Sequence, residues 1–167
     1  MGEQLTFVDE DDHPIGIGDR KEAWANGYYT RNIRVVIRDE NGKFLSQKRS
    51  IKKESYPGLW TVAASGHVDA GEDWDEAALR ETDEEIGVST PLKLLGHFSF
   101  EHDDKDKKIR QIVHLYEGIL DSKTQFVLDK NEVDDIKWYD LEELKVLMYQ
   151  TPDKFTPSFK ETVNMFY

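Results

Sequence analysis

The segment from Trp74 to Ile86 constrains the fold of this chain more than any other part of the sequence. Its pattern is helical, because acidic residues fill the first turn and Gly87 stands where a helix usually ends. Residues 72–85 contain eight carboxylates and one basic side chain, so they carry −7 of the formal net charge of −12. A helix this acidic can bury only one narrow face, and we expect that face to pack against a sheet.

At about 100° of rotation per residue, this helix has three faces. The predicted core stripe is Leu79, Thr82 and Ile86. The face predicted to point broadly to solvent is Glu72, Asp73, Glu76, Arg80 and Asp83. On the third face Glu81 and Glu85 stand one turn apart with Glu84 beside them, and Trp74, Ala77 and Ala78 continue the stripe. Such like charges destabilise a helix unless something offsets them. Hard oxygen ligands of this kind suit Mg²⁺ or Mn²⁺, and a solvated acidic face is the alternative.

Strands and further helices are predicted on both sides of this helix. The predicted strands are residues 4–9, 32–38, 44–47, 59–64, 92–101, 109–119 and 136–138, and the other predicted helices are residues 20–26, 141–148 and 157–166. Asn41-Gly42 predicts a hairpin between the second and third strands. If the polar loop 103–108 closes an antiparallel hairpin, Glu101 faces Arg110 in the paired strand, and His97 likewise faces His114. This order indicates one α/β domain over residues 1–167, with helices covering a mixed sheet.

Composition narrows the partners that such a domain can have. A net charge of −12 would repel nucleic-acid phosphates and an anionic membrane, so we expect neither as a partner. The absence of cysteine excludes disulfides, thiolate metal sites and a cysteine nucleophile. The start of the chain lacks a signal-peptide pattern, and no apolar run approaches the roughly 20 residues of a membrane helix. We therefore expect a cytoplasmic protein, and we leave a homodimer open.

Residues 66–88 resemble the signature box of the Nudix hydrolases. The matching positions are Gly66, Glu72, Arg80, Glu81, Glu84, Glu85, Gly87 and Val88. Thr82 stands where the family usually has an aliphatic residue. The resemblance implies a Nudix-type α/β/α sandwich around a mixed β-sheet. It also implies Mg²⁺-dependent hydrolysis of a diphosphate linkage in a nucleoside diphosphate derivative or similar organic diphosphate, with water attacking phosphorus.

The resemblance implies a role for each position of the box. The implied ligands of Mg²⁺, or alternatively Mn²⁺, are Gly66, Glu81, Glu84 and Glu85, and the three glutamates are the implied catalytic set. The implied structural positions are Glu72 and Arg80, which brace the loop against the helix, and Gly87, which ends the helix. A small-molecule diphosphate is the implied substrate.

Other motifs resemble the isopentenyl-diphosphate isomerase-like branch of the family. They comprise residues 7–10, 14–16, 47–50, 57–61 and 65–67. Ser65, however, replaces the cysteine of the isomerase, and Thr30, Ile109 and Gln111 stand at or near the positions of its metal histidine and acidic pair. Among those groups only His67 is retained. We therefore favour hydrolysis, and keep as alternatives an isomerase-like proton-transfer enzyme and a non-catalytic module that senses a diphosphate.

The remaining candidate residues would bind substrate or activate water. The substrate-binding candidates are Arg49, Lys53 and His67, of which the first two match positions that grip a diphosphate in the resembling enzymes. Basic side chains suit that task, and an exposed basic loop is the alternative. The candidate general bases outside the box are Glu101 and Glu132. For Glu101 the competing interpretation is a cross-strand ion pair with Arg110.

Overall fold

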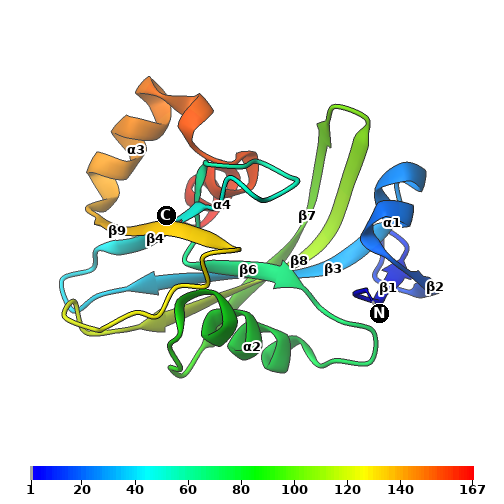
Figure 1. Cartoon of the computed structure of the whole chain (residues 1–167), viewed down its shortest axis with the longest axis horizontal. Coiled ribbons are helices and arrows are strands. Elements are labelled where there is room, and N and C mark those ends of the chain that lie inside the picture. The colour runs from blue at the N-terminus through cyan, green and yellow to red at the C-terminus, as the bar shows by residue number, and fades with distance from the viewer. Residues whose placement is uncertain (1) are drawn as a thin grey trace.

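A nine-stranded mixed sheet forms the centre of the computed structural model, which describes residues 2–167 (Figure 1). The strands are β1 (Leu5–Val8), β2 (Pro14–Gly18), β3 (Tyr29–Arg38), β4 (Phe44–Arg49), β5 (Trp60–Thr61), β6 (Ala64–His67), β7 (Lys93–Asp104), β8 (Lys107–Ile119) and β9 (Val133–Tyr139). The helices are α1 (Arg20–Asn26), α2 (Trp74–Ile86), α3 (Leu141–Gln150) and α4 (Pro157–Phe166), with a 3₁₀ turn η1 (Pro152–Lys154). In Figure 1, α2 lies on one side of the sheet and α3 and α4 lie on the other.

The alternation of side chains along β3 builds a separate core on each face of the sheet. Ile33 and Val35 pack in one buried cluster with Ala77 and Ala78 of α2. The opposite cluster contains Val36 and draws on α3 and α4 through Leu144, Phe159 and Val163. Helices therefore cover both faces, and the predicted α/β/α sandwich is confirmed.

The central strand β3 joins most of the sheet. It runs parallel to β8 from the pair Thr30–Gln111 to the pair Arg38–Ile119, and antiparallel to β6. The hairpin predicted at Asn41-Gly42 is present, but β3 and β4 pair only near the turn, where Arg38 opposes Phe44. Farther along β3 the neighbouring position belongs to β6, so β4 pairs with β5 and β9 instead.

The β7–β8 hairpin has the predicted register, with Glu101 opposite Arg110 and His97 opposite His114. Its strands extend to Asp104 and from Lys107, so they are longer than predicted and leave only a tight turn between them. The long strands close into a ribbon that projects beyond the body of the sheet (Figure 1). The prediction of a longer loop here was wrong, because the polar residues of the tip continue the ladder.

Residues 59–64, predicted as one strand, form two short strands in different places. β5 pairs with β4, whereas β6 begins at Ala64, pairs with β3 and continues through Gly66 to His67. The chain therefore crosses from one neighbour to the other at Val62 and Ala63. Residues 59–64 are mostly apolar because the chain is buried before and after this crossing. Periodicity could not reveal that the paired strand changes from β4 to β3. Strand β2 was not predicted.

Helix α2 has the predicted bounds and ends at Gly87, whose φ of +69° lies in the left-handed region that favours glycine. Thr82 and Ile86 are buried as predicted, but Leu79 is 43% exposed, so its place in the core stripe was wrong. Ala77 and Ala78, predicted to continue that stripe, are fully buried, because a helix that approaches a sheet closely accommodates small side chains there. Within residues 2–167, no helix is long and apolar enough to cross a membrane.

Candidate active site

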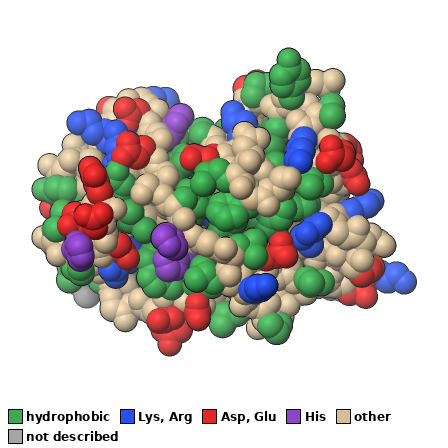
Figure 2. All heavy atoms as spheres, turned by 180° about the vertical axis from the view of Figure 1, so that it is seen from behind, with side chains coloured by type: hydrophobic (Ala, Val, Ile, Leu, Met, Phe, Trp, Pro, Cys, Tyr) green, Lys and Arg blue, Asp and Glu red, His purple; other side chains and the backbone are tan. Residues whose placement is uncertain are grey.

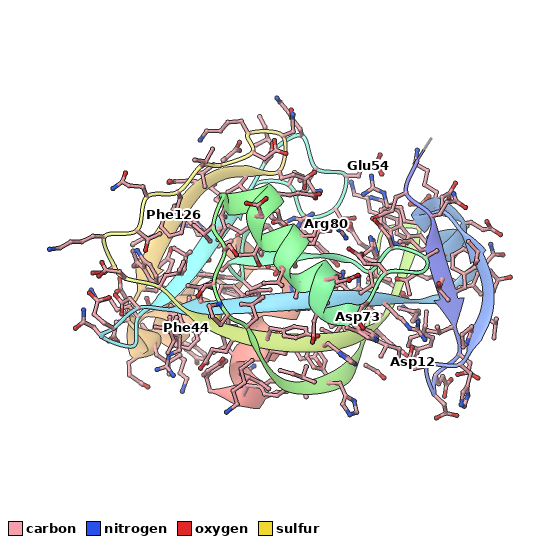
Figure 3. All side chains as sticks on the ribbon, turned by 90° about the horizontal axis from the view of Figure 1, so that it is seen from below. Asp12, Phe44, Glu54, Asp73, Arg80 and Phe126 are labelled. Atoms are coloured by element: carbon pink, nitrogen blue, oxygen red, sulfur yellow. The ribbon has the colours of Figure 1, made fainter. Side chains whose placement is uncertain are left out.

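Helix α2 lies in front of the sheet in Figure 3, which views the molecule of Figure 1 from below, and it contacts strand β6. Asp73 caps the start of helix α2, and its side chain accepts a hydrogen bond from the Asp75 amide at 2.9 Å. Farther along, Glu85 is buried at 5% exposure, Glu81 is half-buried and Glu84 is exposed. The helix thus presents a graded set of carboxylates, from a fully enclosed one to one in solvent.

Glu85 is held by two neutral donors. Gln47 of β4 donates from Nε2, and the backbone amide of Ser65 donates to Oε1 at 3.2 Å. Among residues 2–167 no basic side chain forms an ion pair with Glu85. A buried carboxylate without a cation carries a large desolvation cost.

Arg80 connects the helix to the loop that precedes it. It donates to both oxygens of Glu72, at 2.7 and 2.9 Å, and to the carbonyl of His67 at 3.1 Å. Glu72 in turn accepts from the Asp69 amide at 2.9 Å. Arg80 and Glu72 are therefore half-buried, and their predicted place on a solvent face was wrong. The bidentate pair forms the brace that the resemblance implied.

Gly66 lets the backbone of β6 come against Glu81. A Cβ atom at this position would lie 2.2 Å from the carboxyl carbon of Glu81, closer than real Cβ contacts allow. Any larger residue at this position would therefore displace the Glu81 carboxylate, and glycine serves here for space and not for a special backbone angle. The close approach puts the Gly66 backbone and the Glu81 carboxylate on one small surface.

The electrostatics of this surface favour a bound cation. Burial raises the pKa of Glu85, and the neighbouring charge of Glu81 raises it further. Burial likewise raises the pKa of Glu81, although Arg80 lowers it. Carboxylate oxygens beside a backbone carbonyl are hard ligands of the kind that Mg²⁺ and Mn²⁺ prefer, so these residues can hold a divalent cation.

The carboxylate oxygens of Glu81, Glu84 and Glu85 do not gather around one point. Arg80 lies between two of them, at 2.8 Å from Glu81 and 3.3 Å from Glu84. Within the described chain, the acidic and histidine ligand atoms that gather within 4.8 Å of one another belong to Asp9, Asp11 and His13. That group is an exposed turn, whose shape comes from the amides of Asp11 and His13 donating to Asp9.

A cavity of about 370 Å³ adjoins the carboxylates through Gly66. The three predicted substrate-binding residues, Arg49, Lys53 and His67, all line it. Arg49 donates to the carbonyl of Ser55 at 3.0 and 2.8 Å, and Lys53 forms an ion pair with Glu132. The fold therefore brings the predicted basic groups beside the predicted acidic ones.

The two candidate bases occupy different environments. Glu132 lines the cavity, whereas Glu101 is exposed on β7 and is not among the described residues that line it. Glu101 accepts a hydrogen bond from Tyr29 Oη and lies 3.9 Å from Nε of Arg110. The cross-strand ion pair that competed with catalysis for Glu101 is thus present.

Sequence reasoning missed the polar residues on the floor of the cavity. Asn32 and Arg34 reach it from β3, and Gln111, noted before only as a neutral replacement, reaches it from β8. A signal for the first two was available, since they alternate with Ile33 and Val35 in a strand expected to be buried. Polar residues on the second face of an inner strand indicate a lined cavity.

Fold and site together define a class of protein. The family model of the NUDIX domain matches residues 28–159, and this chain belongs to that family. An isopentenyl-diphosphate Delta-isomerase 2 of Photorhabdus laumondii is 33% identical over 165 residues, covering 98% of this chain and 92% of the relative. The predicted resemblance to the Nudix hydrolases and their isomerase-like branch is therefore confirmed.

Two further comparisons bear on activity and fold. A prenyl-diphosphate phosphatase of Methanosarcina mazei is 28% identical over 161 residues, covering 95% of this chain and 92% of that protein. A crystal structure of a Deinococcus radiodurans protein has a TM-score of 0.82 at 23% identity, with 99% of both chains covered. The family and its relatives support an enzyme that acts on diphosphate bonds.

Proposed function

We propose that this protein is a Mg²⁺-dependent hydrolase of a nucleoside diphosphate derivative or similar organic diphosphate. The observation that carries the proposal is the buried Glu85, which lacks a cationic partner in the described chain and accepts a hydrogen bond from Ser65, a residue that lines the cavity with Arg49 and Lys53. A divalent cation bound there would neutralise phosphate charge and acidify the attacking water.

The remaining residues would bind substrate and move a proton. Arg49 and Lys53 would hold the diphosphate from the cavity side, and a fork-shaped guanidinium suits its oxygens. Glu132 is the better-placed base of the two candidates, because it lines the same cavity and its partner Lys53 would turn to the substrate. The exposed pairing of Glu101 supports a structural role in the β7–β8 ribbon.

Hydrolysis of a substrate panel tests this proposal. Nucleoside diphosphate derivatives and prenyl diphosphates would be incubated with Mg²⁺, and release of monophosphate or phosphate would be measured. We expect turnover of at least one substrate, and a loss of more than about 100-fold in Glu85→Gln, since even residues behind a metal ligand cost 10- to 100-fold. Glu76→Gln removes one exposed charge from the same helix and should retain activity. No turnover by the wild type would refute the proposal.

Proton-transfer isomerisation is the second candidate, favoured by the isomerase relative. The positions that would carry its chemistry by resemblance do meet in the structure: Thr30 pairs with Gln111, and Ser65, Ile109 and Gln111 all line the cavity. All four side chains are uncharged and do not titrate near neutral pH. We therefore expect no solvent deuterium in an isoprenyl diphosphate incubated with the protein, and incorporation would favour the isomerase.

A further inference from the structure

The cavity lies mainly on the face of the sheet opposite α2. Asn32 and Arg34 point to it from β3, while the intervening Ile33 packs toward α2. The segment that follows β4 and the start of α4 complete its walls, through residues such as Tyr56 and Thr156. Its volume of about 370 Å³ falls within the 300–1,000 Å³ typical of small-molecule sites.

Unpartnered polar atoms concentrate in this cavity. Five buried side-chain atoms of residues 2–167 have no hydrogen-bond partner, and four of them belong to residues that line the cavity. These four are Asn32 Oδ1, Arg34 Nε, Ser55 Oγ and Tyr56 Oη. Buried polar groups in folded proteins are normally paired, so these four atoms can form hydrogen bonds with the polar atoms of a ligand in the cavity.

Arg34 is the charged member of this group, so its burial has the highest desolvation cost. It is only 5% exposed, stacks over Phe100 at 5.3 Å, and donates from one terminal nitrogen to Gln111 Oε1 at 2.8 Å. No carboxylate in the described chain forms an ion pair with Arg34. Burial lowers the pKa of Arg34 to about 10, which leaves it charged at neutral pH. Gln111 supplies one neutral acceptor, but a buried charge without an ionic partner is costly, and Nε of Arg34 has no acceptor in the described chain.

We propose that the part of the substrate outside the diphosphate is a polar group that accepts hydrogen bonds from Arg34 and donates one to Asn32. A nucleobase or a sugar has this chemistry and a prenyl chain does not. Gln111 is then a positioning residue, since it fixes the guanidinium of Arg34. This inference rests on the proposed function, because it assumes that the diphosphate is bound beside Glu81 and Glu85.

The residues that line the cavity also favour a polar ligand. The hydrophobic side chains that line it are Trp24, Tyr56, Phe100 and Ile109, and the other lining residues are polar, charged or glycine. A prenyl chain would cover Asn32 and Arg34 without replacing any hydrogen bond. Sites built to bond a polar group reject analogues that lack it by factors of about 10⁴ or more.

Binding without turnover tests the inference. Affinities would be measured calorimetrically with Mg²⁺ for methylene-diphosphonate analogues, whose bridging carbon prevents cleavage between the phosphorus atoms. The probes are the adenosine, uridine, ribose and geranyl methylene-diphosphonates and bare methylene-diphosphonate. We expect a nucleoside or ribose probe to bind at least about 100-fold more tightly than the geranyl probe. Comparing the nucleoside and ribose probes distinguishes a base from a sugar.

The variant Arg34→Met should reduce that preference by at least about tenfold. Binding of bare methylene-diphosphonate should remain within about threefold, as should every affinity in the matched control Arg38→Met, which lies on the same strand outside the cavity. Asn32→Leu provides the same comparison if Arg34→Met does not fold.

Three results would overturn the inference. They are a geranyl probe that binds the wild type as tightly as the polar probes, an equal loss of bare methylene-diphosphonate and polar probes in Arg34→Met, and no binding of any probe. If the protein prefers polar probes but hydrolyses nothing, the proposed function is refuted and this inference stands.

Discussion

At the scale of single residues, two features define this site: Gly66 has no side chain, and Glu85 has no ionic partner in the described chain. Gly66 has no Cβ, so β6 can touch Glu81. Glu85 has no cation in the described chain, although it is buried and bonded to Gln47 and Ser65. The buried carboxylate costs the fold free energy in isolation, and a cation bound as proposed would offset that cost.

Gly66→Ala should lower kcat/KM for diphosphate hydrolysis by about 10- to 100-fold, with a smaller effect on the melting temperature. The new Cβ would meet the Glu81 carboxyl carbon at 2.2 Å, and a flexible carboxylate can move aside more easily than the backbone. Steady-state kinetics and thermal melting of the variant check this. Gly16→Ala is the matched control, because its nearest neighbour is Phe7 Cδ2 at 3.6 Å. Full activity in Gly66→Ala would show that this contact does not matter.

At the scale of elements, the approach of α2 to the sheet decides where the carboxylates lie. Ala77 and Ala78 are fully buried and allow close packing, which brings Glu85 below the sheet and leaves Leu79 outside. Helical periodicity gave the correct ends of α2 and the buried positions Thr82 and Ile86, but it wrongly included Leu79. The angle at which a helix docks depends on residues of the sheet, and these are remote in sequence.

Two matched truncations on α2 test this packing. Ile86→Ala should lower the free energy of unfolding by about 2–4 kcal/mol, since Ile86 is fully buried and its removal leaves a cavity. Leu79→Ala should lower it by less than about 1 kcal/mol, because 43% of Leu79 is already exposed. Urea unfolding of both variants provides the comparison. Equal losses would mean that Leu79 belongs to the core after all.

At the scale of the whole molecule, the net charge of −12 is not a uniform field. Acidic and basic side chains are interspersed on the face shown in Figure 2, and part of the acidity belongs to the half-buried Glu81 and the buried Glu85. Their folded-state pKa values lie above the ordinary value of 4.5. The unfolded chain therefore releases these protons first as the pH rises. The contribution of these two groups to the free energy of unfolding is therefore complete at low pH. It is lost as the pH rises from about 5 through their folded-state pKa values.

The metal-free protein should accordingly melt at a lower temperature at pH 8 than at pH 6, and Mg²⁺ should reverse the loss. At about ten times its dissociation constant, Mg²⁺ should raise the melting temperature by about 3–5 °C at pH 8, and by less at pH 6, where protons compete for Glu85. Scanning calorimetry with NaCl at matched ionic strength separates binding from screening. Glu85→Gln should lose most of the shift, and an unchanged shift in this variant would place the cation elsewhere.

The sequence by itself determined the local features of this protein. The bounds of α2, its end at Gly87, the register of the β7–β8 ribbon and the carboxylates of the box follow from periodicity, turn chemistry and spacing within short segments. The basic residues Arg49 and Lys53 could also be named, because they lie in motifs that resemble those of known enzymes.

Only the tertiary structure decided how distant segments meet. Arg34 and Gln111 are 77 positions apart and touch because β3 and β8 pair in parallel, a connection that no local pattern encodes. The same holds for the crossing between β5 and β6, which brings Gly66 against α2. Local patterns depend on the sequence of short segments, whereas the cavity depends on non-local strand pairing. The residues that we propose to select the substrate lie on the paired strands β3 and β8.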